Sequence, residues 1–319
     1  MRRTCAISID LDPITCYYRI HGLGPAPDAL RSLIMRRCVP RFADILARHE
    51  IEATFFVVAE DIDLDVHGAD ARASRALVAD LVAAGHELGN HSYSHPYDLA
   101  KLSRERIADE IGHAHMLLSE VAGGAITGFR APGYDVSAAI LEELGALGYK
   151  YDSSIFPAPG YYALKAAAMC AMALMRRRSG AVLTDPKALV APADPYRPMP
   201  SAPWRTGQST LVELPVAVTP GARTPVIGTS LLIAPGWLRA RLLRAVSGRP
   251  FFNFELHGID LADAEEDGIP GELVDRQPDL RVPLVRKQRA LEATIDRLRL
   301  DYSFQTLDQV ASRVQRDAL

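Results

Sequence analysis

The sequence predicts an α/β fold in which parallel strands and helices alternate around a closed or nearly closed barrel. Short apolar, β-rich runs alternate with helical patterns along most of the 319 residues, an order typical of parallel strands joined by helices. Seven such steps occur without a fixed-period repeat, and this favours a barrel. With 48% hydrophobic residues the chain can bury one large core or two modest ones, and we expect a single domain over residues 1–319.

Seven segments have the composition of strands. Apolar, β-branched or aromatic residues dominate most of them, and turn-forming residues bound them. They lie at residues 5–10, 53–58, 87–90, 127–130, 149–153, 210–218 and 251–257. Because parallel strands end at one edge of a sheet or barrel, the residues that follow these segments are expected to converge.

Helical periodicity appears between the predicted strands, at residues 39–50, 73–85, 103–123 and 137–148. In the first of these segments Phe42 and Ile45 belong to an apolar stripe at helical spacing, so one face can cover the sheet. Ser103 and Ser137 begin the last two segments, where a serine side chain can cap the first turn.

Residues 157–208 interrupt this order and predict an inserted loop and helix region. Five prolines within residues 192–203 exclude a regular helix or a central strand there. Residues 161–178 contain an apolar run at 166–175 that ends in three arginines at 176–178. This pattern is compatible with peripheral contact to a membrane or with a helix packed on the barrel rim, whereas ten apolar residues cannot span a bilayer.

Composition limits the partners and the compartment. The 36 Lys+Arg and 39 Asp+Glu give a formal net charge of −3, which offers no overall attraction to nucleic acid. Four cysteines lie far apart without a C-x-x-C pair, so neither a disulfide framework nor a zinc knuckle is indicated. Asp10 breaks the apolar run at the N-terminus too early for a signal peptide. We therefore expect a cytoplasmic protein, and its oligomeric state stays open.

Polar residues follow several predicted strands, where parallel α/β folds build their sites. The first strand leads to Asp10 and Asp12, which alternation points to one side, so a cation or a proton must separate them unless they cap a helix. The third strand leads into GNHSYSHP, which contains His91 and His95. Two imidazoles and one carboxylate form the ligand set of a catalytic zinc site, although histidines at this spacing also occur without metal.

Five runs in this chain resemble the motifs of the polysaccharide deacetylase family, also called carbohydrate esterase family 4. In order, they read SIDLDP, GNHSYSHP, FRAPGY, YDSSIFP and ELHGID. The resemblance extends over nearly the whole chain and implies a deformed (β/α)7-type barrel, with 157–208 as its insertion. It also implies a divalent metal ion, zinc above cobalt, nickel or manganese, and hydrolysis of an N-acyl bond, most often on an N-acetylated sugar.

The resemblance further implies which residues hold the metal and activate water. By position in the motifs, Asp12, His91 and His95 match the metal ligands, and Asp10 matches the general base. Arg130 matches the arginine that orients this base. A neutral amide resists water, so both a metal and a carboxylate base suit the reaction. Without the resemblance, Arg130 reads equally well as an ion-pair residue of the barrel rim.

Three more residues match groups that stabilise the intermediate and release the amine. The main-chain N–H of Tyr134 matches an oxyanion donor, which typically contributes about 10²–10³ in rate. His257 matches the general acid, and Asp152 matches the carboxylate that supports it. A histidine kept cationic by a carboxylate can protonate a departing amine near neutral pH. On their own, Asp152 also reads as a turn cap and His257 as a strand-end histidine.

The first and last motifs depart from the family pattern. Leu11 separates Asp10 from Asp12 where the family usually has adjacent aspartates, so the roles of base and ligand can be exchanged. Pro13 replaces a glycine after the first motif. Glu255 stands where an apolar residue is common, and it points either into the site or toward the helices.

We expect a substrate that carries an N-acetyl or N-formyl aminosugar, either a small intracellular molecule or a lipid-linked one. Two alternatives stay open. One is an amidase or cyclic-imide hydrolase that acts on a non-sugar substrate, and the other is a catalytically silent binding module. Metal content and sensitivity to chelators separate the first alternative from a metal-dependent deacylase.

Overall fold

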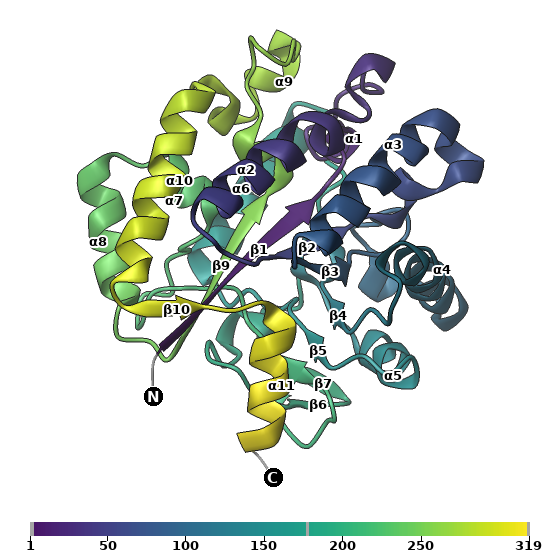
Figure 1. Cartoon of the computed structure of the whole chain (residues 1–319), viewed down its shortest axis with the longest axis vertical. Helices are drawn as coiled ribbons and strands as arrows, with labels where there is room; N and C mark the ends of the chain where they lie inside the picture. The colour runs from purple at the N-terminus through teal and green to yellow at the C-terminus, as the bar shows by residue number, and fades with distance from the viewer. Residues whose placement is uncertain (1–2, 177–178, 318–319) are drawn as a thin grey trace.

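The structure is a computed structural model that describes residues 3–176 and 179–317 (Figure 1). An 8-stranded sheet lies at its centre, and all of its pairings are parallel. The strands are β1 (Arg3–Leu11), β2 (Thr54–Val57), β3 (Glu87–Asn90), β4 (Gly128–Phe129), β5 (Tyr151–Asp152), β8 (Val212–Glu213), β9 (Phe251–His257) and β10 (Tyr302–Phe304). The sheet curls, and helices cover its outer side, which confirms the predicted fold class.

The strand order follows the chain except around β1. From β1 the sheet continues through β2, β3, β4 and β5 to β8, while both β9 and β10 also pair with β1. A hydrogen bond from Ala217 N to Asn253 O, 3.3 Å long, links the segment after β8 to β9 and almost completes the barrel. Each predicted strand segment contains an observed strand, but β10 was not predicted, because three residues are too few to give a periodic signal.

Helices follow most of the strands and pack on the outside of the barrel (Figure 1). They include α1 (Ile14–Ile20), α2 (Val39–Arg48), α3 (Leu64–Ala83), α4 (Arg104–Ala122), α5 (Ala138–Ala146), α7 (Gly228–Ile233), α8 (Gly236–Val246), α9 (Gly271–Val274), α10 (Leu284–Arg299) and α11 (Leu307–Asp317). Ser103 and Ser137 cap α4 and α5 as predicted, since their hydroxyls accept from Arg106 N and Ile140 N. Helix α3 starts earlier than predicted, because Asp63 caps it and a kink at Gly68 joins two helical pieces.

Two neighbouring strands place polar rows inside the barrel. In the parallel register of β1 and β9, Ser8 lies opposite Glu255, and Asp10 lies opposite His257. Side chains alternate between the two faces of a strand, so the polar residues at positions i and i+2 share the inner face. The alternate residues, such as Ile9 in β1, belong to the main apolar core. This alternation sets the position of the candidate site.

The predicted insertion contains a helix and a small separate sheet. Helix α6 (Pro159–Leu174) comes first, and the proline-rich part forms an antiparallel pair of β6 (Pro198–Met199) and β7 (Ala202–Thr206) outside the main sheet. Of the predicted arginine cluster, Arg177 and Arg178 lie outside the described residues. Within the described part of the chain, no helix has both the length and the apolar composition needed to cross a bilayer.

Candidate active site and metal centre

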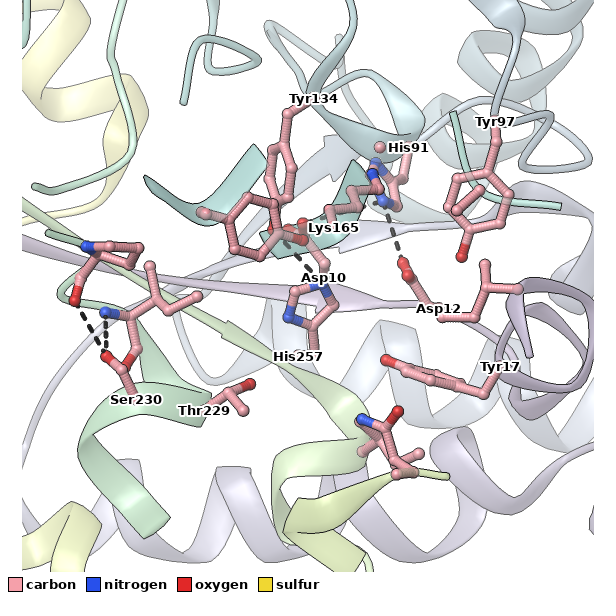
Figure 2. A pocket seen from close by; sticks show the side chains of 18 residues that line it. Asp10, Asp12, Tyr17, His91, Tyr97, Tyr134, Lys165, Thr229, Ser230 and His257 are labelled. Atoms are coloured by element: carbon pink, nitrogen blue, oxygen red, sulfur yellow. Dashed lines mark hydrogen bonds and ion pairs between the residues drawn. The ribbon is translucent and has the colours of Figure 1, made fainter. Parts of the chain in front are cut away.

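Asp12, His91 and His95 meet in the interior although almost eighty positions separate the first from the others. One ligand atom from each lies within 4.8 Å of the other two. Asp12 Oδ1 lies 3.1 Å from His91 Nε2 and 3.2 Å from His95 Nε2, and all three side chains are buried. Figure 2 shows His91 and Asp12 pointing toward one another. The structure thus brings the three predicted ligands together.

The GNHSYSHP run forms a rigid turn around Asn90. The Asn90 side chain accepts from Ser92 N at 2.8 Å and donates to Ile111 O at 3.0 Å, which ties the turn to α4. Ser92 and His95 have positive φ values of 64° and 55°, and His95 N donates to Ser92 Oγ at 3.1 Å. These bonds hold a strained backbone that aims both imidazoles at Asp12.

The donor set fits a divalent metal ion. His91 Nδ1 lies 2.7 Å from the main-chain oxygen of Arg130, so that nitrogen carries the proton and Nε2 presents its lone pair. His95 Nε2 is buried and has no hydrogen-bond partner among the described residues. Two imidazole nitrogens and a carboxylate oxygen are ligands that zinc prefers, and they leave room for a fourth ligand.

Electrostatics also favour a cation at this place. Burial opposes ionisation of Asp12, but His95 and His91 outweigh it and hold the pKa of Asp12 well below its usual range. Burial likewise favours neutral His95, yet Asp12 raises the pKa of His95 to about 10. The centre therefore keeps an ionised carboxylate that attracts either a proton or a metal ion.

Asp10 lies beside the metal centre and is held by Arg130. Arg130 Nη1 donates to Asp10 Oδ1 at 2.5 Å, and Asp10 Oδ2 lies 3.9 Å from His91 Nε2. The fully buried guanidinium also donates to Ser8 Oγ at 3.0 Å and to Ser153 Oγ at 2.8 Å. Its carbon lies 4.2 Å from the centre of the Phe56 ring, a cation–π distance. One oxygen of Asp10 is thus fixed, and the other faces the ligands.

His257 has a carboxylate partner that differs from the predicted one. Glu255 Oε1 lies 2.8 Å from His257 Nδ1, and Glu255 is fully buried. Tyr134 Oη donates to Glu255 at 3.0 Å and lies 3.3 Å from His257 Nε2. Burial disfavours the imidazolium, but the charge of Glu255 outweighs it and raises the pKa of His257 well above its usual range.

Asp152 lies in a separate carboxylate pair. It is opposite Glu213 in the parallel pairing of β5 and β8, and its Oδ1 accepts from Ser154 Oγ. Burial raises the pKa of Asp152 to about 6, and burial together with Asp152 raises the pKa of Glu213 well above its usual range. Among the hydrogen bonds of the described residues, none joins Asp152 to His257. The structure therefore places Glu255, and not Asp152, beside the predicted acid.

The backbone of Tyr134, the predicted oxyanion donor, has an unusual conformation with positive φ. Gly133 and Tyr134 have φ values of 68° and 62°, and the turn begins at Pro132. The N–H of Tyr134 donates to Ala131 O at 3.1 Å, so this donor already has a partner within the turn. Tyr134, which ends the FRAPGY run, contacts the site residues Glu255 and His257 through its side-chain hydroxyl.

Of these groups, Asp10, Asp12, His91, Tyr134 and His257 line one cavity of about 380 Å³. Its walls also include aromatic and polar residues that the sequence did not indicate, namely Tyr17, Tyr97, Tyr161, Lys165, Thr229, Ser230 and Gln277 (Figure 2). Tyr161 and Lys165 belong to α6, so the insertion builds one wall. Burial lowers the pKa of Lys165 to about 8, and Asp135 opposes this. No local motif identifies Tyr161 and Lys165, because the insertion that carries them is placed only by tertiary packing.

Comparisons with known proteins show what this chain is similar to. Residues 28–151 match the family model described as polysaccharide deacetylase. The chain is 27% identical over 152 residues to a peptidoglycan deacetylase of Helicobacter pylori, a match that covers 47% of this chain and 48% of that protein. It is 33% identical over 110 residues to a chitin deacetylase of Colletotrichum lindemuthianum, covering 34% and 42%. The chain thus spans less than half the length of these relatives.

One solved structure resembles nearly the whole chain. It is the crystal structure of a protein assigned to the polysaccharide deacetylases, from Mycobacterium smegmatis, and it has a TM-score of 0.59 at 18% identity. The match covers 100% of this chain and 93% of that protein. At this identity the likeness concerns the fold alone, and it agrees with the deformed barrel.

Proposed function

We propose, from its similarity to the polysaccharide deacetylase family, that the chain is a metal-dependent hydrolase that removes an N-acetyl or N-formyl group from an aminosugar. One observation carries this proposal: Asp12 and His91, which form a buried cluster with His95, line a cavity together with a fixed carboxylate, Asp10, and a charged imidazole, His257. The alternation inside the barrel supports a single catalytic domain, with 157–208 as its insertion.

The proposed roles follow from the contacts. A divalent ion held by Asp12, His91 and His95 would polarise the acyl carbonyl and acidify the attacking water. Asp10 takes the proton of that water through the oxygen that Arg130 leaves free. This division of the two aspartates is supported by distance, since Asp12 contacts both imidazoles. The water oxygen then becomes part of the released carboxylate, and the C–N bond breaks.

His257 supplies the proton that the departing amine needs. Its Nε2 faces the cavity beside Tyr134 Oη, and Glu255 holds the proton on Nδ1. A buried ion pair of this kind keeps the imidazole cationic until the amine takes its proton. We retain the Tyr134 N–H as the oxyanion donor, which requires that its bond to Ala131 opens when substrate binds.

The size of the cavity supports a substrate that presents a single, small sugar unit. At about 380 Å³, it has the size of a site that surrounds a small ligand, and Tyr17, Tyr97 and Tyr161 offer ring faces for a sugar. We propose a nucleotide-linked or lipid-linked aminosugar in the cytoplasm. The four cysteines support that compartment, since none forms a disulfide and Cys170 is exposed.

The test combines metal analysis with a substrate screen. Purified protein should contain about one divalent ion per chain, and a chelator should abolish activity. N-formyl and N-acetyl aminosugars, free, nucleotide-linked and lipid-linked, are then assayed for released formate or acetate. Chelator-resistant hydrolysis of a non-sugar amide would contradict the proposal and favour an amidase. Binding of these sugars without turnover would indicate a silent module.

A further inference from the structure

Helix α6 exposes an apolar surface that the barrel does not cover. Of its residues only Tyr162 is buried. The side chains of Leu164 and Leu174 are 73% and 87% exposed, and the next residue, Met175, is 61% exposed. No charged residue occurs from 166 to 175. We call the exposed side chains from Leu164 to Met175 the α6 surface. Contiguous apolar surface of this kind marks an interaction site.

The two ends of α6 have different surroundings, and both help to identify what binds to the α6 surface. In its first turns, Tyr161 and Lys165 line the candidate active-site cavity. Beyond its last turn, Arg176 lines a depression of about 900 Å³ together with Arg19 and Arg31, where Glu60 is the acidic residue. Arg31 is paired with Asp28 at 2.9 Å, which leaves Arg19 and Arg176 against Glu60, so positive charge still exceeds negative charge in this depression. The sequence continues with Arg177 and Arg178, which lie outside the described residues.

We propose that the α6 surface docks on an anionic lipid bilayer, so that the active-site cavity lies next to the lipid headgroups. A helix that is too short to span, carries no charge after Lys165 and is followed by arginines has the composition of an interfacial helix. Its apolar side chains enter the boundary of the acyl chains, and the arginines pair with acidic headgroups. A second copy of the chain is a poorer partner for this surface. Unless the two α6 helices packed antiparallel, their arginine clusters would lie next to each other and repel.

The docking adds to the proposed function a reason for a membrane-anchored substrate. Only this choice of substrate rests on the proposed function, and the docking itself does not. An aminosugar anchored in the bilayer would reach the cavity along α6, because the same helix contributes the apolar surface and the cavity wall. Water-soluble substrates would not depend on docking.

Vesicle flotation tests the docking directly. The full chain is mixed with phosphatidylcholine vesicles that contain about one third phosphatidylglycerol, or with pure phosphatidylcholine. We expect flotation with the acidic vesicles and at least about tenfold weaker partitioning to neutral ones. Replacing Arg176, Arg177 and Arg178 by glutamine should weaken partitioning about 10²-fold. The double variant Leu164→Glu/Leu174→Glu should weaken it at least about tenfold.

Matched controls carry the same chemical changes elsewhere. Leu300→Glu changes a leucine that is 77% exposed at the end of α10, and a triple glutamine variant at Arg241, Arg244 and Arg286 removes three exposed arginines. We expect both controls to float like the wild type. Thermal denaturation should give unchanged Tm values for the leucine variants and for the triple arginine control, because their changed side chains are exposed.

The proposal is overturned if the wild type stays with the soluble fraction, or if the α6 variants float as well as the controls. It is also overturned if the α6 surface joins two copies, seen as concentration-dependent sedimentation that the leucine variant abolishes. Flotation needs no turnover, so a failed substrate screen and a failed docking test give different results.

Discussion

Replacement of Glu255 by glutamine tests whether this carboxylate keeps His257 protonated. The two side chains lie 2.8 Å apart, and Glu255 is fully buried. At a charge separation of ~4 Å and an effective dielectric constant of ~20, the attraction that glutamine removes is about 4 kcal/mol. Because about 1.4 kcal/mol corresponds to a factor of ten, the imidazole should bind its proton about 10³-fold more weakly.

We therefore expect the alkaline fall of kcat/KM to move to lower pH in Glu255→Gln. Glu255 raises the pKa of His257, so the wild-type imidazole is protonated at neutral pH and loses its proton only as the pH rises through that raised pKa. Without the negative charge, the proton leaves at lower pH. Release of free amine, followed against pH, should give a rate at neutral pH about 10²–10³-fold below the wild type.

Asp152→Asn is the matched control, since it makes the same carboxylate-to-amide change in the other candidate partner. In this variant the alkaline fall of kcat/KM should occur at the same pH as in the wild type. The imidazole signals of His257, followed by NMR in both variants, give a readout that needs no substrate. The reasoning is refuted if Asp152→Asn shifts the alkaline fall of kcat/KM and Glu255→Gln leaves it unchanged, when both variants have the metal content and Tm of the wild type.

Four further perturbations probe the same region. Asp12→Ala should leave less than about one tenth of the wild-type metal after dialysis, measured by elemental analysis, and should remove the thermal stabilisation by added zinc. Metal affinity should fall progressively as the pH is lowered below about 10, because protons compete for the imidazole of His95, and titration calorimetry measures this. Arg130→Met should reduce the free energy of unfolding by about 3–5 kcal/mol in urea denaturation, since it leaves a buried carboxylate unpaired. Gly89→Ala should reduce it by about 1–3 kcal/mol, because the added methyl would lie 2.4 Å from the ring of Phe56, on which the arginine stacks.

The sequence was sufficient to predict the parts of the fold and site that have strong local patterns. The strands at 87–90 and 251–257 were predicted at their observed bounds. An aromatic run marks the second strand, and Gly85 before the first strand and the GNHSYSHP run at its end mark the first. The convergence of Asp12 and the two histidines followed from parallel strands ending at one edge. The distances between them agree with that inference.

Motif order alone was not sufficient to identify the partner of His257. A motif gives a position along the chain, whereas the contact depends on which face of a strand a side chain occupies. Glu255 lies two residues before His257 in one strand, so period-two alternation already pointed both to the same side. Asp152, on β5, lies next to β8 instead. Tyr161 and Lys165 were inaccessible to such reasoning, because the insertion that carries them has no regular place in the barrel.

The position of β1 has a consequence for how the protein folds. Arg3 pairs with Tyr302, and residues 4–10 pair with 251–257, so this strand is made first and gains two of its neighbours last. During synthesis its hydrogen-bonding edges are open to other chains, which is an aggregation hazard. Contacts across nearly 300 positions also give a high contact order, so folding should be slow, and chaperone demand should be greatest before the final strands emerge from the ribosome.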